Sequence, residues 1–169
     1  MSDANALRVR YNVDDARMYL AIAGSACHRT SLVGEHLATE FLAKNPAAPE
    51  FILDLDASRF LDSTFAGWMI RLFQRLKAVG GRLVVSRCPD RCRADLQVMG
   101  LTSLFDFEDV TAPATARELS NSEIEDLDPS TLAHMLQAHE DLTQINEENR
   151  RVFTPITDAL RNEMKKRES

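Results

Sequence analysis

The stretch Phe51–Thr64 reads FILDLDASRFLDST and decides the fold that we expect for this chain. Its first part, Phe51–Leu55, is a nearly continuous apolar run, which is typical of a short strand buried on both faces of a sheet. The polar break Asp56–Arg59 closes this strand. Ser63 then falls where a helix would have its N-cap, at the surface and beside the first free backbone N–H groups. The stretch therefore predicts a central strand that leads into a helix.

The residues that follow predict further helices and strands in alternation. The helix that starts at Ser63 continues to Val79 with a stripe of apolar side chains at Phe65, Met69, Leu72, Phe73, Leu76 and Val79. Gly80-Gly81 supplies the left-handed stop with which helices commonly end. The later patterns indicate a strand at Arg82–Ser86, a short helix at Pro89–Met99 that Gly100 ends, and a last strand at Leu104–Phe107.

The residues before the central strand predict a β-hairpin and one helix. Apolar and polar side chains alternate in Ala6–Tyr11, and Arg17–Ala23 forms a second run after a turn at Asn12–Asp15. Gly24-Ser25 ends the hairpin, and Ser31 can cap a helix that stops at Asn45-Pro46. Because helices alternate with strands, we expect an α/β fold in which helices pack on a mixed sheet of four to five strands.

The character of the chain changes after residue 111. We expect one domain at residues 1–111, a polar linker at 112–127 and a helical extension at 128–169 that begins at Asp128-Pro129. Pro155 interrupts the helical pattern, so we expect two helices, with Thr154 capping the second. Three polar residues share the seam of the apolar side chains in this extension, namely His139, Asn146 and Asn149. We expect the extension to pack on the domain, or to form an antiparallel pair that mediates self-association, giving a homodimer.

Composition narrows the classes of protein and site. The chain has 169 residues, of which 44% are hydrophobic and 27% charged, enough for one core with an appendage. The net charge of −6 and the lack of a basic stripe argue against a nucleic-acid partner. No apolar run is long enough for membrane insertion, which favours a soluble protein. The three cysteines Cys27, Cys88 and Cys92 are expected to be free thiols, in keeping with a cytoplasmic location.

The sequence shows no recognisable set of catalytic or metal-ligating residues. The spacing of Cys88 and Cys92 is loose for a metal site, even with Cys27-His28 added, so we expect no metal and no cofactor. His134 and His139 are five residues apart, which does not place them on one face of a helix. No arrangement of nucleophile, base and orienting group emerges, and no glycine-rich phosphate loop is present.

Residues 51–64, Gly80–Val85 and Val98–Phe105 together resemble the STAS family, the fold of bacterial anti-sigma-factor antagonists. In that family a buried strand leads through a short loop to Asp-Ser-Ser or Asp-Ser-Thr at the start of a helix, and the next strand starts with Gly-Gly or Gly-x. Asp62-Ser63-Thr64 and Gly80-Gly81 match this order, and the similarity extends over roughly residues 6 to 110. Phe65-Ala66-Gly67 stands where the family usually has Gly-Leu-Gly, so only the second glycine is kept.

The resemblance implies a binding module and not an enzyme. Family members act by partner switching: the unphosphorylated protein binds an anti-sigma factor that is also a serine kinase of the histidine-kinase-like ATPase fold. Phosphorylation of the serine releases the partner, and a serine phosphatase of the PP2C type reverses the modification. Carried onto this chain, the acceptor is Ser63, with Thr64 as the second candidate.

The partner surface that we expect surrounds this serine. On the helix, Trp68, Arg71 and Arg75 share a face at spacings i, i+3 and i+7, which would offer an aromatic anchor flanked by cations. The alternative is that the core or the C-terminal helices partly cover Trp68, and that the two arginines form a solvated face. Nearby carboxylates would repel a phosphate group on Ser63. The full set of expected contact residues is Asp54, Asp56, Asp62, Ser63, Thr64, Phe65, Trp68, Arg71 and Arg75.

Two other functions fit the same sequence. In the first, the domain is a docking subunit of a lipid-transport ABC ATPase complex, and Ser63 or Thr64 is a contact that is never phosphorylated. In the second, the chain is a signalling scaffold that binds its partner through the helical extension. A partner that is an ABC-type ATPase would favour the first, and partner binding by the extension alone would favour the second.

Overall fold

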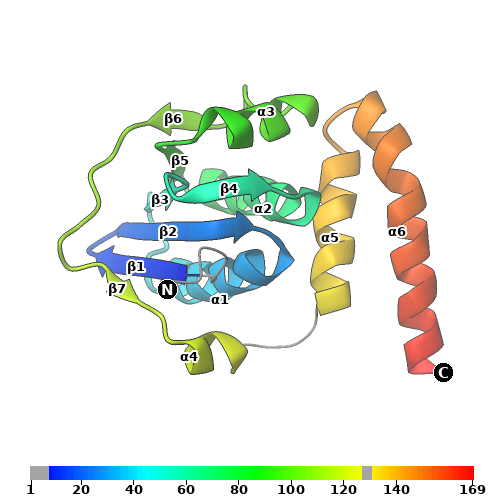
Figure 1. Cartoon of the computed structure of the whole chain (residues 1–169), viewed down its shortest axis with the longest axis horizontal. Helices are drawn as coiled ribbons and strands as arrows, with labels where there is room; N and C mark the ends of the chain where they lie inside the picture. The colour runs from blue at the N-terminus through cyan, green and yellow to red at the C-terminus, as the bar shows by residue number, and fades with distance from the viewer. Residues whose placement is uncertain (1–7, 127–130) are drawn as a thin grey trace.

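The computed structural model describes residues 8–126 and 131–169, and a mixed sheet lies at its centre (Figure 1). The strands run in the order β6-β5-β3-β2-β1-β7, with β4 paired to the end of β2. β1 is antiparallel to β2 and β7, and the other neighbours are parallel. The strand bounds are β1 Arg8–Asp14, β2 Arg17–Ala26, β3 Glu50–Asp54, β4 Ser58–Leu61, β5 Arg82–Ser86, β6 Asp106–Glu108 and β7 Arg117–Glu118.

The sheet thus has seven strands in the described part of the chain, more than the four to five that we expected from the sequence. β4 forms in what we interpreted as a polar break, because its end residues are buried and Ser58 Oγ donates to the Ile22 carbonyl at 3.0 Å. β7 and the short helix α4 (Asn121–Glu125) lie in the segment that we expected to be a linker. Both strands pair with residues distant in sequence, which local patterns do not reveal.

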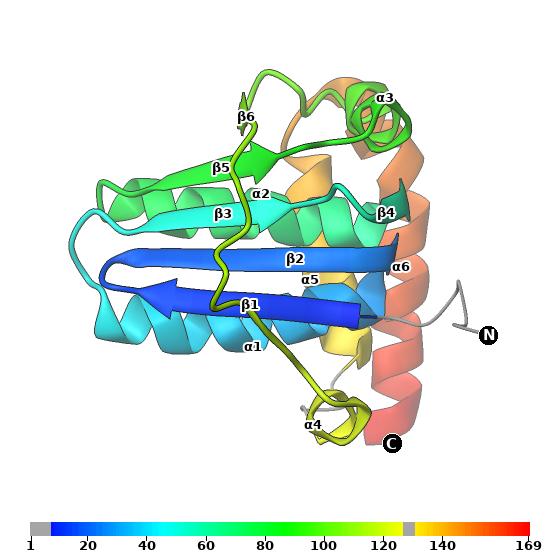
Figure 2. The same ribbon diagram turned by 60° about the vertical axis from the view of Figure 1, so that its left-hand side comes forward.

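Helices cover one face of the sheet, and an extended segment crosses the other. α1 (His28–Lys44) and α2 (Ser63–Ala78) lie on the first face, with α3 (Asp90–Val98) beside β4 (Figures 1 and 2). The main core fills the space between the sheet, α1 and α2. On the opposite face, residues 109–116 cross the strands and cover a small cluster of Tyr19, Ile52 and Val84 (Figure 2).

Several element ends differ from the sequence expectations. β1 extends to Asp14, and the hairpin turn falls at Asp15-Ala16, where Asp15 has a φ of 47°. β2 continues through Gly24 to Ala26, because a bulge at Gly24/Ser25 bends it toward β4. β6 begins later than the expected strand at Leu104–Phe107.

Helix ends follow their capping groups. α1 begins at His28, not Ser31, because the Cys27 N–H donates to Thr30 Oγ1 at 2.8 Å and so fixes the first turn. Gly80 and Gly100 have φ values of 73° and 72°, which confirms both as the left-handed residues that follow helices.

The C-terminal extension forms an antiparallel pair of helices, α5 (Thr131–Thr143) and α6 (Glu147–Glu168), and α5 packs on α2 (Figure 1). The expected start at Asp128-Pro129 lies outside the described residues. Two helices are present as expected, but the predicted break at Thr154-Pro155 is wrong. The break falls at residues 144–146, where Asn146 caps α6. Pro155 lies inside α6 at an exposed position. Proline has no N–H to donate to the carbonyl one turn earlier, but at the surface that carbonyl can bond water instead.

Candidate functional site at the start of helix α2

The start of α2 is held in place by the strands that precede it. The Asp62 N–H donates to the Ala26 carbonyl at the end of β2, at 2.9 Å. The Asp62 carboxylate accepts from the Phe65 N–H at 2.8 Å, so Asp62 is the N-cap and the expectation that Ser63 caps the helix is wrong. Aspartate takes this place because its charge also suits the positive end of the helix dipole. Ser63 is therefore the first helical residue, and its hydroxyl is not needed for capping.

The Ser63 hydroxyl instead contacts His139 of α5. Ser63 Oγ and His139 Nε2 are 2.8 Å apart, and His139 Nδ1 is 2.7 Å from the Met135 carbonyl. A carbonyl only accepts, so Nδ1 carries the proton, and in the neutral ring Nε2 is the acceptor for the Ser63 O–H. The imidazole is buried and packs against the Phe153 ring of α6. The expected phosphate acceptor is thus covered by the helical extension.

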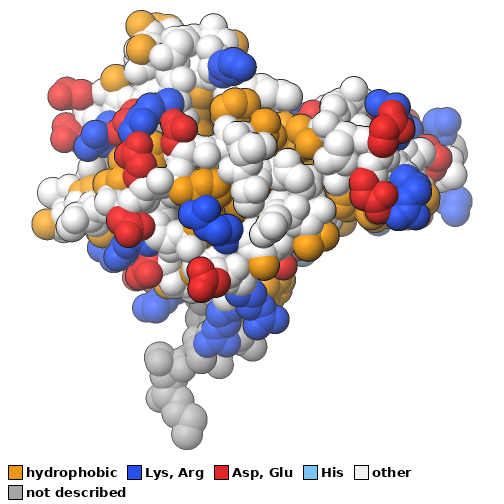
Figure 3. Space-filling model, turned by 90° about the horizontal axis from the view of Figure 1, so that it is seen from above, with side chains coloured by type: hydrophobic (Ala, Val, Ile, Leu, Met, Phe, Trp, Pro, Cys, Tyr) orange, Lys and Arg blue, Asp and Glu red, His pale blue; other side chains and the backbone are white. Residues whose placement is uncertain are grey.

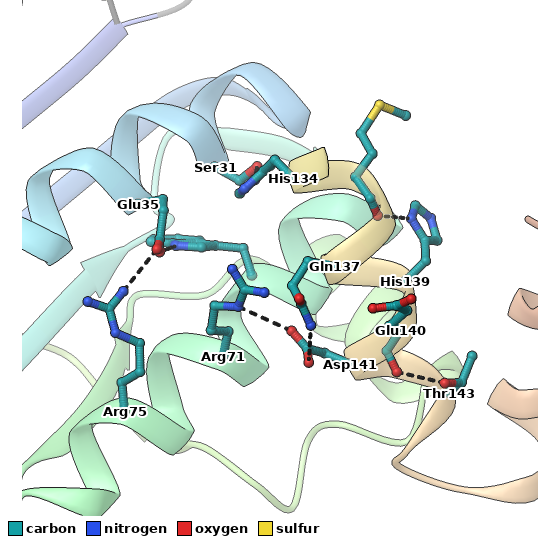
Figure 4. A network of polar contacts seen from close by, with 12 residues as sticks. Ser31, Glu35, Arg71, Arg75, His134, Gln137, His139, Glu140, Asp141 and Thr143 are labelled. Carbon is teal, nitrogen blue, oxygen red and sulfur yellow. Dashed lines mark hydrogen bonds and ion pairs between the residues drawn. The ribbon is translucent and has the colours of Figure 1, made fainter. Parts of the chain in front are cut away.

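Three further contacts join α5 to the helices beneath it, and Figure 4 shows the two that involve side-chain pairs. Ser31 Oγ of α1 lies 2.7 Å from His134 Nε2. Arg71 Nε lies 3.5 Å from Asp141 Oδ2. Between these pairs the two backbones touch: a Cβ added to Gly67 would lie 2.1 Å from the Ala138 carbonyl oxygen. α5 therefore packs on α2 without room for a methyl group.

The expected aromatic anchor is wrong for Trp68, whose side chain is buried between α1 and α2. Its ring packs edge-on against Phe51 and Phe65. Its indole N–H donates to Glu35 of α1 at 3.0 Å, and the same carboxylate accepts from Arg75 at 2.9 Å (Figure 4). Trp68 and Arg75 thus join two helices of this chain. The helix packs more deeply than its apolar stripe alone suggests, because α1 crosses it closely at Gly34.

Three other expected contact residues have buried side chains, namely Asp54, Thr64 and Phe65. The expectation that these three side chains contact a partner does not fit this structure, because a buried side chain does not meet a partner at the surface. Ser63 and Arg71 lie on the face of α2 that α5 contacts, and Asp62 caps the same helix. Asp56 is exposed, but its carboxylate faces Arg87 at 3.4 Å.

Asp54 belongs to a different cluster, on the face of the sheet opposite α1 and α2. Its carboxylate accepts from the Tyr19 hydroxyl and from the Arg87 guanidinium. Burial, with the hydrogen bond to Asp54, raises the pKa of Tyr19 to about 12. The hydrogen bond to Asp54 also raises the pKa of Arg87, so this guanidinium stays charged across the ordinary pH range. The cluster lines a hollow of 340 Å³ beside β1 and ties the ends of β3 and β5 together.

The described residues form no metal site, and their charges are mixed on the face that Figure 3 shows. On the face seen in Figure 3, acidic and basic side chains lie next to one another. Within residues 8–126 and 131–169, no three His, Cys, Asp or Glu side chains are placed to hold a metal ion, and no helix is long and apolar enough to span a membrane. The three cysteines are unpaired, as expected, and burial raises the pKa of Cys88 to about 11 and of Cys92 to about 12.

Sequence reasoning did not anticipate the α5 residues in this site, although one signal was present. His139, Asn146 and Asn149 stand on the apolar seam of the extension, where polar residues are unusual. Each makes a specific contact: His139 meets Ser63, Asn146 caps α6, and Asn149 Nδ2 donates to the Met99 carbonyl at 2.9 Å. Two of these three polar residues, His139 and Asn149, thus mark contacts between the extension and the domain.

The contact between α5 and α1 is expected to weaken in acid. Burial lowers the pKa of His134, as do Arg71 and His28, whereas Glu35 opposes the shift. Protonation is therefore disfavoured while α5 is docked, so the contact is fully stable above the ordinary histidine pKa of 6.5 and loses stability as pH falls below it. Hydrogen exchange of α5 amides, corrected for intrinsic rates, should accelerate more between pH 7.5 and 5.5 in the wild type than in His134→Gln.

This comparison isolates His134 from a nearby group of opposite sign. Burial raises the pKa of Asp141, so protonation of that carboxylate favours docking, but it does so equally in both proteins. Glutamine keeps a polar partner for Ser31 and does not titrate. Equal acceleration in the two proteins would show that His134 does not control the contact.

The fold and this helix start define a class of protein. The sequence model of the STAS domain family matches residues 11–114, so the chain belongs to this family. Among solved structures, it is similar to the unphosphorylated form of the anti-sigma factor antagonist SpoIIAA, with a TM-score of 0.53 and 19% identity over 63% of this chain and 89% of that one. An anti-sigma factor antagonist from Mycobacterium paratuberculosis matches with a TM-score of 0.51 and 19% identity, over 65% and 92% of the two chains. At these identities the likeness establishes the fold.

Proposed function

We propose that this protein is a cytoplasmic anti-sigma-factor antagonist that acts by partner switching. In its unphosphorylated form it binds an anti-sigma factor that is also a serine kinase of the histidine-kinase-like ATPase fold. Phosphorylation of Ser63 releases that partner, and a PP2C-type phosphatase restores the first state. The observation that carries the proposal is the position of Ser63, directly after the capping Asp62 at the start of α2 in a STAS domain.

The geometry supports Ser63 over Thr64 as the acceptor. Thr64 is 3% exposed, whereas Ser63 is half-buried and its hydroxyl points outward from the first turn of α2 to α5. A phosphate on Ser63 would add a charge of about −1.5 to −2 beside the Asp62 carboxylate. At a protein interface that offers no cation, like-charge repulsion and desolvation together cost several kcal/mol, which lowers affinity by about 100-fold or more. The modification therefore acts as a switch on binding.

Mass spectrometry of the protein from its own cells tests this proposal. Trypsin releases residues 60–71, which hold both Ser63 and Thr64, and fragment ions separate the two hydroxyls. We expect a phosphate on Ser63 that disappears in Ser63→Ala. Ser103→Ala, at an exposed serine in the turn after α3, should keep the phosphate and serves as the matched control.

Two results would contradict the proposal. A phosphate that remains on this peptide in Ser63→Ala would move the acceptor to Thr64. No phosphate in either growing or stressed cells would reject partner switching by phosphorylation, and would favour the unmodified docking subunit of an ABC ATPase complex. The proteins that co-purify would then include an ABC-type ATPase in place of a serine kinase.

A further inference from the structure

Helix α5 occupies the surface that surrounds the proposed acceptor. Its contacts on α2 recur every four residues along one face, at Ser63, Gly67 and Arg71. A fourth contact, to Ser31, extends the same surface onto α1 (Figure 4). These four residues form what we call the α5 platform. It includes Ser63 and Arg71, two residues of the surface that the proposed function assigns to a partner.

We propose that the α5–α6 pair is an intramolecular cap on this surface, and that docking of α5 and engagement of Ser63 by a partner exclude one another. This inference rests on the proposed function. The capped form hides the acceptor from the kinase and the platform from the anti-sigma factor. The open form exposes both.

Steric exclusion follows from two contacts. The Ser63 hydroxyl hydrogen bonds to His139, whose ring is 3% exposed and backed by Phe153. Phosphoryl transfer needs the γ-phosphorus to reach this oxygen in line with the P–O bond that breaks, and the imidazole contacts the same oxygen. At Gly67 the α5 backbone leaves no space for even a methyl group, so no partner segment fits between α2 and α5.

The four platform residues meet α5 through three polar pairs and one backbone contact, and polar groups regain hydrogen bonds to water when they part. Leu142 of α5 and Phe153 of α6 also join the main core, so opening the cap exposes some apolar surface. Asp141 is imperfectly paired: its Oδ2 atom is buried without a hydrogen bond, and Arg71 lies 3.5 Å away. A second attachment lies at the other end of the pair, where Asn149 bonds the Met99 carbonyl.

The platform also sets which sequence pattern a partner helix needs in order to bind in place of α5. Close approach at Gly67 requires a helix with a small residue at the crossing point, as Ala138 is in α5. Arg71 requires an acidic side chain about one turn further along, as Asp141 is. We therefore infer that the partner contacts the platform with a helix of this pattern, in competition with α5.

Gly67→Ala in the full chain tests the cap. Alanine favours helix α2 but its methyl group collides with Ala138, so the variant should release α5 while the domain stays folded. We expect hydrogen exchange of α5 amides to rise about tenfold or more, with little change in β3 and β5. The fraction of Ser63 phosphorylated in cells should rise by a similar factor. Gln74→Ala, on an exposed part of α2, is the matched control and should change neither.

A second variant opens the cap without touching α2. Asn149→Ala removes the bond to Met99 and should accelerate α5 exchange and raise phosphorylation in the same direction. Unchanged α5 exchange in both variants would overturn the cap, as would faster exchange with an unchanged, measurable level of phosphate on Ser63. Faster exchange with no phosphate in any protein would instead reject the proposed function, so the two failures are distinguishable.

Discussion

Replacing Trp68 by alanine is expected to destabilise the protein by about 3–5 kcal/mol, which lowers the melting temperature by roughly 10 °C. The side chain is 1% exposed and lies between α1 and α2, so truncation leaves a cavity among the aromatic rings of Phe51 and Phe65. It also removes the donor to Glu35. Thermal unfolding followed by circular dichroism measures the loss, since Trp68 is the single tryptophan and the variant has no tryptophan fluorescence.

A conservative variant and an exposed aromatic residue serve as controls. Trp68→Phe keeps most of the apolar contact and should lose about half as much stability. Phe60→Ala truncates a ring that is 41% exposed and should cost only about 1 kcal/mol or less. If Trp68→Ala were as mild as Phe60→Ala, the side chain would be a surface group and the original expectation of an interface anchor would return.

Replacing Asp54 by alanine is expected to cost about 3 kcal/mol. The carboxylate is buried and holds both the Tyr19 hydroxyl and the Arg87 guanidinium, so its loss leaves a buried hydroxyl and a cation without partners. We take the lower part of the range for broken buried pairs because the Arg87 side chain is 36% exposed and can reach water. Urea unfolding at neutral pH, followed by Trp68 fluorescence, measures the change.

A double-mutant cycle with Tyr19→Phe separates the two partners of Asp54. In the wild type, removing the hydroxyl loses a hydrogen bond and should reduce stability. In the Asp54→Ala background, the same change removes an unpaired buried hydroxyl and should restore stability. An equal effect in both backgrounds would mean that Tyr19 and Asp54 are not coupled.

The elements that the sequence predicted well are those whose signals are local. The apolar run of β3 and the amphipathic stripe of α2 record burial directly, and glycines mark the helix ends at Gly80 and Gly100. β4 and β7 were missed because their stability comes from pairing with β2 and β1 rather than from their own composition. The same holds for α6, where tertiary packing overrides the helix-breaking tendency of Pro155.

The same distinction between local signals and contacts distant in sequence applies to the site. The pattern of Asp62-Ser63-Thr64 located the start of α2, because capping chemistry lies within a few residues of the helix that it serves. His139 is 76 residues from Ser63, and no rule of spacing connects them. The sequence left open whether Trp68 is buried, since a helix with apolar residues on its stripe and beside it can be covered on a second side by another helix.

The order of the elements along the chain determines when α5 can first cover Ser63 during synthesis. The ribosome completes β3, α2 and β5 before it makes α5, and domains generally begin to fold as they emerge. A newly made domain therefore presents Ser63 uncovered for the time needed to synthesise and dock the last two helices. Under the proposed function, a kinase that meets the chain during its synthesis would find Ser63 uncovered, whereas docked α5 contacts it in the folded molecule. The time of that encounter would then affect whether Ser63 carries a phosphate.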